Sequence, residues 1–288
     1  MSFAGHLFLA LLEGTVTGFV LALTALGLSL VFGVMRIVNV AHGEFFMLGA
    51  VIAWYFSTMF GGFLVALIAA PLIVGGIAFL ADRLILRQIE YNPESTIVAT
   101  IGLLYIFQQL VLTIYGPYAR PVVPPLYFRV DFPWFGYSGY KLLVAGASGL
   151  LIWATWLVVS KTTLGLYMRA TQQDREMAQA FGVPVQRVYT VVFSLGAGLT
   201  AVAGALIVPV QQAHYLMGLD ALLMSFIVVI IGGLGSLKGT LAAAFIIGIT
   251  DGVVSVFFAP TLAKIVATML VALVLVVRTG GLFGEEAA

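Results

Sequence analysis

Residues 160–187 read SKTTLGLYMRATQQDREMAQAFGVPVQR, the longest polar, helix-competent stretch in a chain that otherwise consists of apolar runs. Asp174 can cap a short helix, Glu176 stands in its first turn, and Gly182 can close it before Pro184. A helix of about two turns is unstable alone. Its acidic and small residues give it no apolar face for lipid, so we favour a docked helix over one lying on the membrane surface.

The composition around this stretch defines the class of protein. The chain has 288 residues, of which 62% are hydrophobic and 9% charged, and its mean hydropathy is +1.13. Soluble domains carry roughly 25% charged residues. The apolar runs are too long, and alternate too little, for barrel strands. The sequence therefore predicts an all-α polytopic membrane protein, with residues 1–288 forming one transmembrane domain.

Apolar runs of about 20 residues mark the candidate spans. They lie at 7–34, 45–59, 63–81, 97–115, 142–159, 188–208, 221–234, 240–258 and 262–277. The first is too long for one untilted span, whereas the second and seventh are short. We expect eight or nine hydrophobic segments, some of them broken or re-entrant. No signal-peptide pattern precedes the first run, which is expected to remain as a span.

The distribution of Lys and Arg between the runs predicts the orientation, because these residues favour the cytoplasmic side. The polar stretch at 160–187 is expected in the cytoplasm. The other parts expected on that side are residues 82–96, Lys238 and Arg278. Residues 209–219 contain neither Lys nor Arg and are expected outside. Residues 116–141 are also expected outside, although they contain three basic residues.

Two segments interrupt the apolar runs in a similar way. Residues 20–34 precede the polar break RIVNVAHGE, and residues 221–234 precede GSLKG. Paired, glycine-interrupted spans in two halves are typical of inverted-repeat transporters with a site near the membrane midplane. Coincidence is the alternative interpretation. Gly233 in the second segment is a candidate residue of the translocation path.

Asn39, His42 and Glu44 lie in the first break. Irregular backbone at membrane depth is tolerated where it is buried in protein or lines a cavity. These side chains therefore either line the substrate path or provide hydrogen bonds for backbone groups that have left the helix. Both interpretations stay open from the sequence.

Four further polar side chains lie inside apolar runs. Asp251 is a functional candidate by default, with a helix–helix hydrogen bond at a small-residue seam as the alternative. We expect no Lys or Arg at membrane depth that could pair with Asp251. Gln108 and Gln109 either pack between helices or line the path. Glu13, near the end of its run, is expected to reach the headgroups.

Several kinds of chemistry are excluded. The chain has no cysteine, which rules out thiolate catalysis and Cys-ligated metals, and its three histidines are too far apart for local metal-ligand spacing. A net charge of +1 predicts no nucleic-acid partner. The segment GGLGSLKGT lacks the Gly-Lys-Ser/Thr order of a phosphate loop, so ATP hydrolysis is expected on another chain.

Several motifs resemble those of one family. The Glu176–Gly182 pattern Glu-x-Ala-x-x-x-Gly, followed by Val-Pro, resembles the coupling loop of binding-protein-dependent ABC importer permeases. Residues 39–50, NVAHGEFFMLGA, resemble a signature of branched-chain amino acid importer permeases, and IGGLGS at 231–236 matches a further family stretch. The tail 278–284, RTGGLFG, is similar to their closing motif, with Thr279 in place of the usual Pro. The match is nearest to the first, shorter permease of the pair that such importers use.

The resemblance implies a function and a set of partners. The chain would be the permease subunit of an importer for branched-chain amino acids or related small amino acids and amides, in a bacterial or archaeal cytoplasmic (inner) membrane. It would assemble with a second homologous permease, two cytoplasmic ATPase subunits and an extracytoplasmic substrate-binding protein. ATP and magnesium would bind the ATPases, with no cofactor or enzymatic activity on this chain. The residues implied in ATPase coupling are Asp174, Arg175, Glu176, Ala178 and Gly182.

The competing function is an ion-coupled secondary transporter or channel. Such a protein needs a coupling-ion site or a charged gate within the spans. Asp251 is the one serious candidate for that site in the sequence.

Overall fold

The computed structural model describes residues 3–60, 62–278 and 280–283. Every apolar run predicted from the sequence lies in a helix, which confirms the all-α class. The bounds are α1 Phe3–Met35, α2 His42–Phe60, α3 Phe63–Ala81 continued by a π-helix at Asp82–Leu86, α4 Pro93–Tyr115, β1 Arg129–Asp131, β2 Gly136–Ser138, α5 Gly139–Lys161, α6 Thr163–Gln173, α7 Arg175–Ala180, α8 Val185–Gln211, α9 Met217–Gly232, α10 Leu237–Phe257 and α11 Pro260–Val277.

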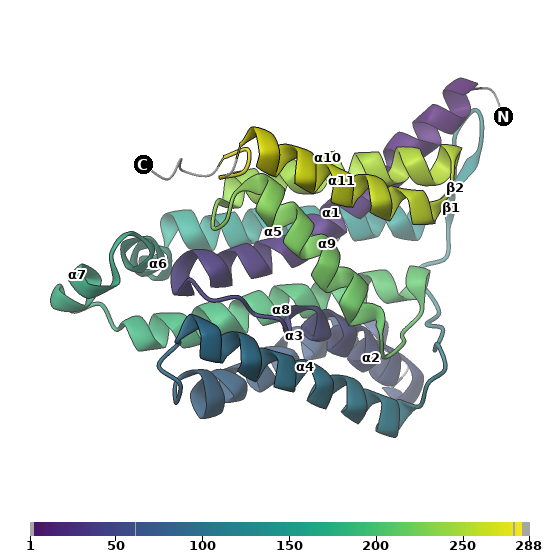
Figure 1. The fold of residues 1–288 in the computed structure, drawn as a ribbon. Helices are drawn as coiled ribbons and strands as arrows, with labels where there is room; N and C mark the ends of the chain where they lie inside the picture. The colour runs from purple at the N-terminus through teal and green to yellow at the C-terminus, as the bar shows by residue number, and fades with distance from the viewer. Residues whose placement is uncertain (1–2, 61, 279, 284–288) are drawn as a thin grey trace.

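α1 is one continuous helix of 33 residues, so the long first run is not one of the segments expected to be broken. Such a helix is about 50 Å long, and its N-terminal part extends past the neighbouring helices (Figure 1). Its small residues allow close packing along α10. A Cβ added to Gly14 would lie 2.7 Å from the Gly248 carbonyl oxygen, which leaves room for glycine alone.

Two of the nine apolar helices differ from the others. Within the described part of the chain, seven helices are long and apolar enough to cross a membrane. α2 is not among them, because His42 and Glu44 lie in its first turn. α9 has only 16 residues. These are the two runs predicted to be short, and the chain between α1 and α2 is irregular and largely buried.

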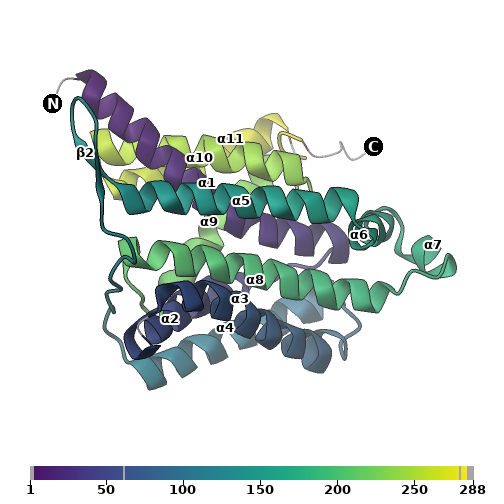
Figure 2. The same cartoon turned by 180° about the vertical axis from the view of Figure 1, so that it is seen from behind.

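The helices form a bundle with α1 and α8 at its centre. The apolar windows of these two helices are 83% and 72% buried, whereas those of α5 and α11 are only 11% buried. Figure 1 shows α4, α9 and α11 on one side of the bundle, and Figure 2 shows α5 and α3 on the other. α7 lies at one end of the molecule and the antiparallel hairpin β1–β2 at the opposite end.

The segments predicted to share a side of the membrane share an end of the molecule. At the α7 end, the Tyr91 ring packs on Tyr189 and the Leu282 N–H donates to the Ile231 carbonyl, which fixes the C-terminal tail beside α9. At the hairpin end, Arg120 and Ala213 exchange backbone hydrogen bonds of 2.7 and 2.8 Å. Positions 279 and 284 of the tail motif lie outside the described residues.

The three basic residues at the hairpin end all have local partners. Arg129 pairs with Asp131 at 3.0 Å, and Lys141 pairs with Glu13 at 2.6 Å. Arg120 donates to the Tyr115 carbonyl oxygen at 2.9 Å. Glu13 is therefore held in an ion pair between α1 and α5, and the expectation that it reaches the headgroups unaided is wrong.

Candidate functional site

α7 is the short helix predicted within residues 160–187. It has six residues, and Asp174 caps it as expected. The Asp174 carboxylate accepts hydrogen bonds from the backbone N–H groups of Glu176 at 2.9 Å and Met177 at 3.0 Å. These bonds satisfy two of the N–H groups that a helix leaves unpaired at its start.

Gly182 ends α7 as predicted, with φ of +82°. Its N–H donates to the Gln179 carbonyl at 2.9 Å, and the Val183 N–H donates to the Ala178 carbonyl at 3.0 Å. These are the two bonds of a Schellman motif, which requires a left-handed residue after the helix. A Cβ on Gly182 would meet no other atom within 4 Å, so the constraint is on its backbone rather than on space.

The outer surface of α7 is exposed and partly apolar. Phe181 is 82% and Met177 53% exposed, whereas Ala178 faces inward with 5% exposure. In both ribbon views the helix projects beyond the rest of the bundle (Figures 1 and 2). Glu176 stands beside these side chains in the first turn. α7 thus presents a small mixed apolar and acidic surface.

A chain of side-chain contacts connects α7 with α8 and with the end of α3. The Arg175 guanidinium lies 5.5 Å from the centre of the Tyr189 ring, and that ring packs edge-on against Tyr91 at 4.8 Å. The Thr190 hydroxyl donates to the Asp82 carboxylate at 2.6 Å. The Arg175 side chain therefore links α7 to α8 of the bundle.

Two buried residues of this contact network, Asp82 and Tyr91, were not identified as candidates from the sequence. Asp82 is fully buried and begins a π-helix, a geometry frequent at functional sites. Burial, with the neighbouring Asp82 carboxylate, raises the pKa of Tyr91, so its hydroxyl stays protonated. An acid directly after a long apolar run was the signal that could have identified Asp82. Nothing in the sequence paired Tyr91 with Tyr189.

α6 contacts two further segments, the residues that follow α1 and those that follow α9. The Arg36 guanidinium donates to the Gln172 carbonyl at 3.1 Å, and the Gln172 side chain donates to the Gly235 carbonyl at 3.5 Å. Arg36 follows α1, and Gly235 lies between α9 and α10. The module formed by α6 and α7 therefore contacts α8 and the ends of α1 and α9.

The polar break after α1 folds into the protein interior. His42 is 1% exposed, and its Nε2 lies 3.0 Å from the Thr24 carbonyl and 2.9 Å from the Thr200 hydroxyl. The Asn39 side-chain oxygen accepts from the Ala41 N–H at 3.1 Å. The Asn39 oxygen thus has the hydrogen-bonding role considered for this break, whereas His42 bonds to two helices that are distant in sequence.

Glu44 extends this buried cluster towards α4 and α9. Its Oε1 accepts a hydrogen bond of 2.9 Å from Gln108, whereas its Oε2 is buried without a hydrogen-bond partner among the described residues. A Cβ on the adjacent Gly43 would overlap the Gly218 carbonyl oxygen, so α2 and α9 touch through their backbones here. The structure brings together Asn39, His42, Glu44 and Gln108.

The other predicted path residues lie elsewhere. Gln109 is exposed and reaches only Thr113 of its own helix, at 3.4 Å. Gly233 ends α9 with φ of +100° at the α7 end, where neighbouring Gly235 packs against Gly33. Asp251 is half-buried in α10.

Asp251 has a basic neighbour, contrary to the sequence expectation. Lys264 of α11 interacts with Asp251 electrostatically and forms an ion pair of 2.8 Å with Asp220 of α9. The expectation of no membrane-depth Lys or Arg was wrong because the run 262–277 contains this lysine.

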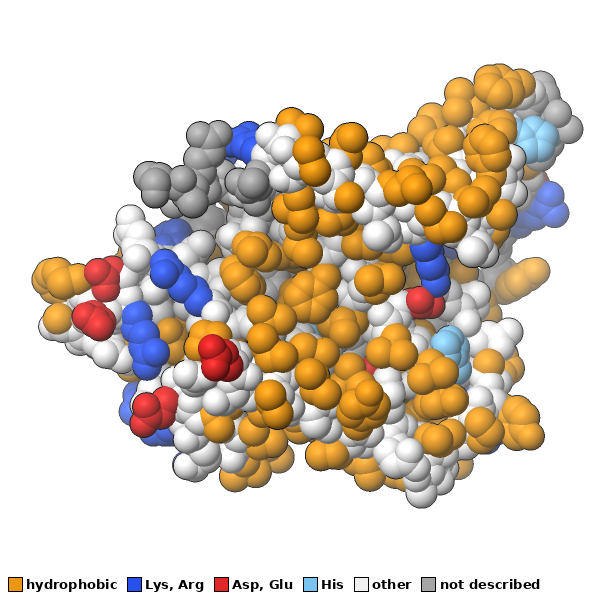
Figure 3. Space-filling view, viewed as in Figure 1, with side chains coloured by type: hydrophobic (Ala, Val, Ile, Leu, Met, Phe, Trp, Pro, Cys, Tyr) orange, Lys and Arg blue, Asp and Glu red, His pale blue; other side chains and the backbone are white. Residues whose placement is uncertain are grey.

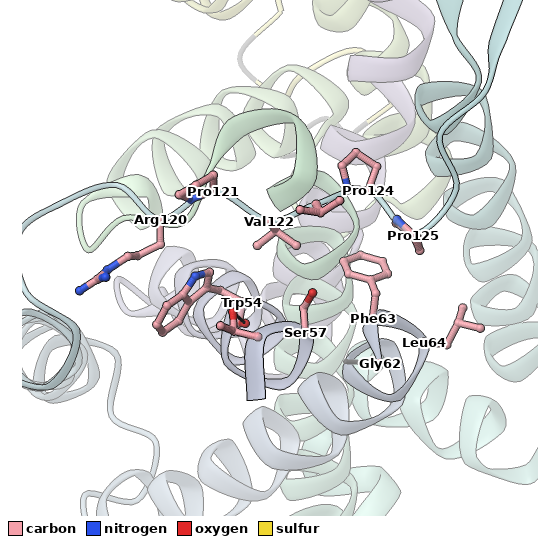
Figure 4. A pocket seen from close by; sticks show the side chains of 12 residues that line it. Trp54, Ser57, Gly62, Phe63, Leu64, Arg120, Pro121, Val122, Pro124 and Pro125 are labelled. Carbon is pink, nitrogen blue, oxygen red and sulfur yellow. Dashed lines mark hydrogen bonds between the residues drawn. The ribbon is translucent and has the colours of Figure 1, made fainter. Parts of the chain in front are cut away.

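A pocket of about 690 Å³ opens at the hairpin end. Its walls are mostly apolar and come from the end of α2, the start of α3 and residues 120–125 (Figure 4). Arg120 lies over the Trp54 ring at 5.2 Å, at the edge of this pocket. Among the described residues, no group of three or more His, Asp or Glu is placed to hold a metal ion.

Comparisons with known proteins agree on one family. A family model described as "Branched-chain amino acid transport system / permease component" matches residues 10–275. The permease LivH of Escherichia coli K12 is 25% identical over 95% of this chain and 94% of its own length. BraD of Pseudomonas aeruginosa is 25% identical over 97% and 96%. A probable LivH of Methanocaldococcus jannaschii is 25% identical over 96% and 92%. No solved structure matches the chain.

Proposed function

Because the chain belongs to the branched-chain amino acid transport permease family, we propose that it is the membrane-spanning subunit of an ATP-driven importer. Its cargo would be branched-chain amino acids or related small amino acids and amides. Its relatives are named as branched-chain amino acid transport permeases. The near-full coverage of both chains agrees with the resemblance to the shorter permease of the pair.

The observation that carries this proposal is the capped, projecting helix α7. Asp174 and Gly182 hold its two ends, and its exposed surface offers Phe181 and Met177 beside Glu176. A rigid surface helix of this kind fits a groove on a cytoplasmic ATPase subunit. Two such subunits would bind ATP and magnesium, and their closure would move α7 against the bundle. This chain would have no catalytic role of its own.

Movement of α7 would reach the spans through the contacts that fix it. Arg175 would pull on Tyr189 of α8, and Gln172 would pull on Arg36 and Gly235. These contacts reach α8 in one direction and the ends of α1 and α9 in the other. A displacement of the α6–α7 module would therefore bias the arrangement of the helices around the path, which the cluster at Asn39, His42, Glu44 and Gln108 would line.

The hairpin end would face a substrate-binding protein outside the inner membrane of a bacterium or archaeon. The pocket beside Trp54 and the proline-rich segment 120–125 give that end a shaped surface. A second homologous permease would complete the translocation path. An ion-coupled mechanism has less support, because Lys264 already interacts with Asp251, the acid that would have to bind the ion.

Replacement of Gly182 tests the coupling role. Gly182→Ala forces a side chain into a left-handed conformation at a cost of about 1–2 kcal/mol, which would disturb the end of α7, so we expect uptake to fall severalfold. The readouts are uptake into proteoliposomes and ATPase activity stimulated by the binding protein. Adding Glu176→Ala should abolish the stimulation or the association with ATPase subunits.

Gly116→Ala is the control. Gly116 has φ of +80° and ψ of 179°, a region in which alanine is at least as strained as at Gly182. Neither glycine has a neighbour within 4 Å of an added Cβ, but Gly116 lies near the hairpin end. The control should transport normally. Normal uptake in the Glu176 and Gly182 double variant would disprove the coupling role of α7, and uptake driven by an ion gradient without ATPase subunits would disprove the importer.

A further inference from the structure

An exposed ion pair interrupts an apolar face of the bundle. Lys264 of α11 and Asp220 of α9 lie 2.8 Å apart with side chains 47% and 65% exposed. The same two helices expose apolar side chains, including Leu223 at 49% and Met269 at 66% exposure. Figure 3 shows this face as largely hydrophobic, with most of the charged groups gathered towards the α7 end.

The pair lies inside the two apolar helices, about one turn from the start of each, since Asp220 is the fourth residue of α9 and Lys264 the fifth of α11. α11 has 18 residues and is therefore about 27 Å long, close to the roughly 30 Å of the hydrocarbon core that it would cross. Lys264 is the fifth residue of α11, about 6 Å from its start. Asp251 adds a second acid six residues before the end of the neighbouring α10. Two acids and one lysine leave this cluster with one uncompensated negative charge.

The opposite side of the bundle has the composition of a lipid-facing surface. α5 contains no charged residue between Lys141 and Lys161, and exposes Trp153 to 56%. α3 contains none before Asp82, and exposes Leu72 to 70%. Charged side chains within spans face protein or water rather than lipid. The ion pair on the α5 side, Lys141–Glu13, is only 26% and 29% exposed, against 47% and 65% for Lys264 and Asp220, so the more exposed pair marks the α9–α11 side as the one covered by protein or water.

We propose that the face formed by α9 and α11 is covered by a second permease subunit, and that the Asp220–Lys264 pair lies on the water-filled path between the two. The remaining negative charge suits a cationic group, either a basic side chain of that subunit or the ammonium of a passing amino acid. This inference rests on the proposed function, which requires two permease subunits but does not say which face joins them.

Cysteine cross-linking tests the face directly, because the chain contains no cysteine. Single variants Leu223→Cys and Met269→Cys are compared with Trp153→Cys and Leu72→Cys, four exposed apolar positions on four different helices. Each is labelled with a maleimide-linked benzophenone in the purified, assembled transporter and irradiated. Mass spectrometry then identifies the attached chain among the known subunits.

We expect Leu223→Cys and Met269→Cys to cross-link to a permease subunit, and the two controls to yield only lipid adducts. A membrane-impermeant thiol reagent should also modify Leu223→Cys at least tenfold faster than Leu72→Cys. Lipid adducts at all four positions, or permease adducts from α5 or α3 alone, would overturn the assignment. If the complex is intact but gives those cross-links, only the assignment of the α9–α11 face is disproved. If no second permease or ATPase copurifies with the chain, the proposed function is disproved.

Discussion

The projecting α6–α7 module and the buried break at residues 36–44 are both polar interruptions between apolar helices, yet they are built differently. α7 is ordered by bonds within a few residues, from the Asp174 cap to the Gly182 turn. The break is ordered by helices distant in sequence, through the contacts of His42 with Thr24 and Thr200. Local order suits an element that must dock on another chain, whereas long-range order suits one that must not move.

Because the buried break is packed and α7 is open, the largest effect is expected at Gly43. Gly43→Ala would force a Cβ into the Gly218 carbonyl oxygen and separate α2 from α9. We expect a loss of about 3 kcal/mol or more in stability, at the upper end of overpacking effects. Thermal unfolding of the detergent-solubilised protein measures it.

Gly102→Ala is the control for this variant. Gly102 lies in α4 with no neighbour within 4 Å of an added Cβ. Alanine is the better helix former, so the control should unfold at the same or a slightly higher temperature. If both variants behaved alike, the break would be looser than the contact between Gly43 and Gly218 indicates.

The adjacent residues Gln108 and Gln109 test the comparison with a change in stability of intermediate size. Gln108→Leu would leave the Glu44 carboxylate with both oxygens unpaired, which we expect to destabilise the protein by about 1–3 kcal/mol. Gln109→Leu removes only a long contact on an exposed surface and should change stability by less than about 0.5 kcal/mol. Equal losses in urea unfolding would contradict the buried cluster.

The smallest effect on stability is expected at Arg175. Arg175→Gln removes the contact with the Tyr189 ring, worth about 0.5–1 kcal/mol. We expect transport per ATP hydrolysed to fall severalfold while the unfolding temperature changes little. Arg187→Gln, an exposed arginine at the start of α8, is the control and should keep the wild-type ratio. A normal ratio in both would mean that α7 acts through Gln172 instead.

Prediction from the sequence succeeded where order is local, as in α7, and failed where it depends on residues distant in sequence. α7 was predicted with its cap and its terminal glycine because those signals lie within nine residues of one another. The candidate path residues were recognised as polar groups in apolar surroundings, but only four of them meet. Gln108 and Gln109 were indistinguishable in sequence, since which of two neighbours points at Glu44 depends on the rotation of α4. Lys264 was readable in the run 262–277 and was overlooked, but its partner Asp220 could not be predicted because the two residues are 44 positions apart.

The sequence by itself determined the membrane class, the positions of the apolar runs but not whether they number eight or nine, the segments that share each end and the local geometry of α7. These depend on hydrophobic run length, charge distribution and hydrogen bonds between near neighbours. Only the tertiary structure decided that α1 continues unbroken, that His42 is held by Thr24 and Thr200, and that Asp220 meets Lys264 on an outer face. The reason is physical: helix packing fixes the rotation and depth of each span, and those select which polar side chains meet.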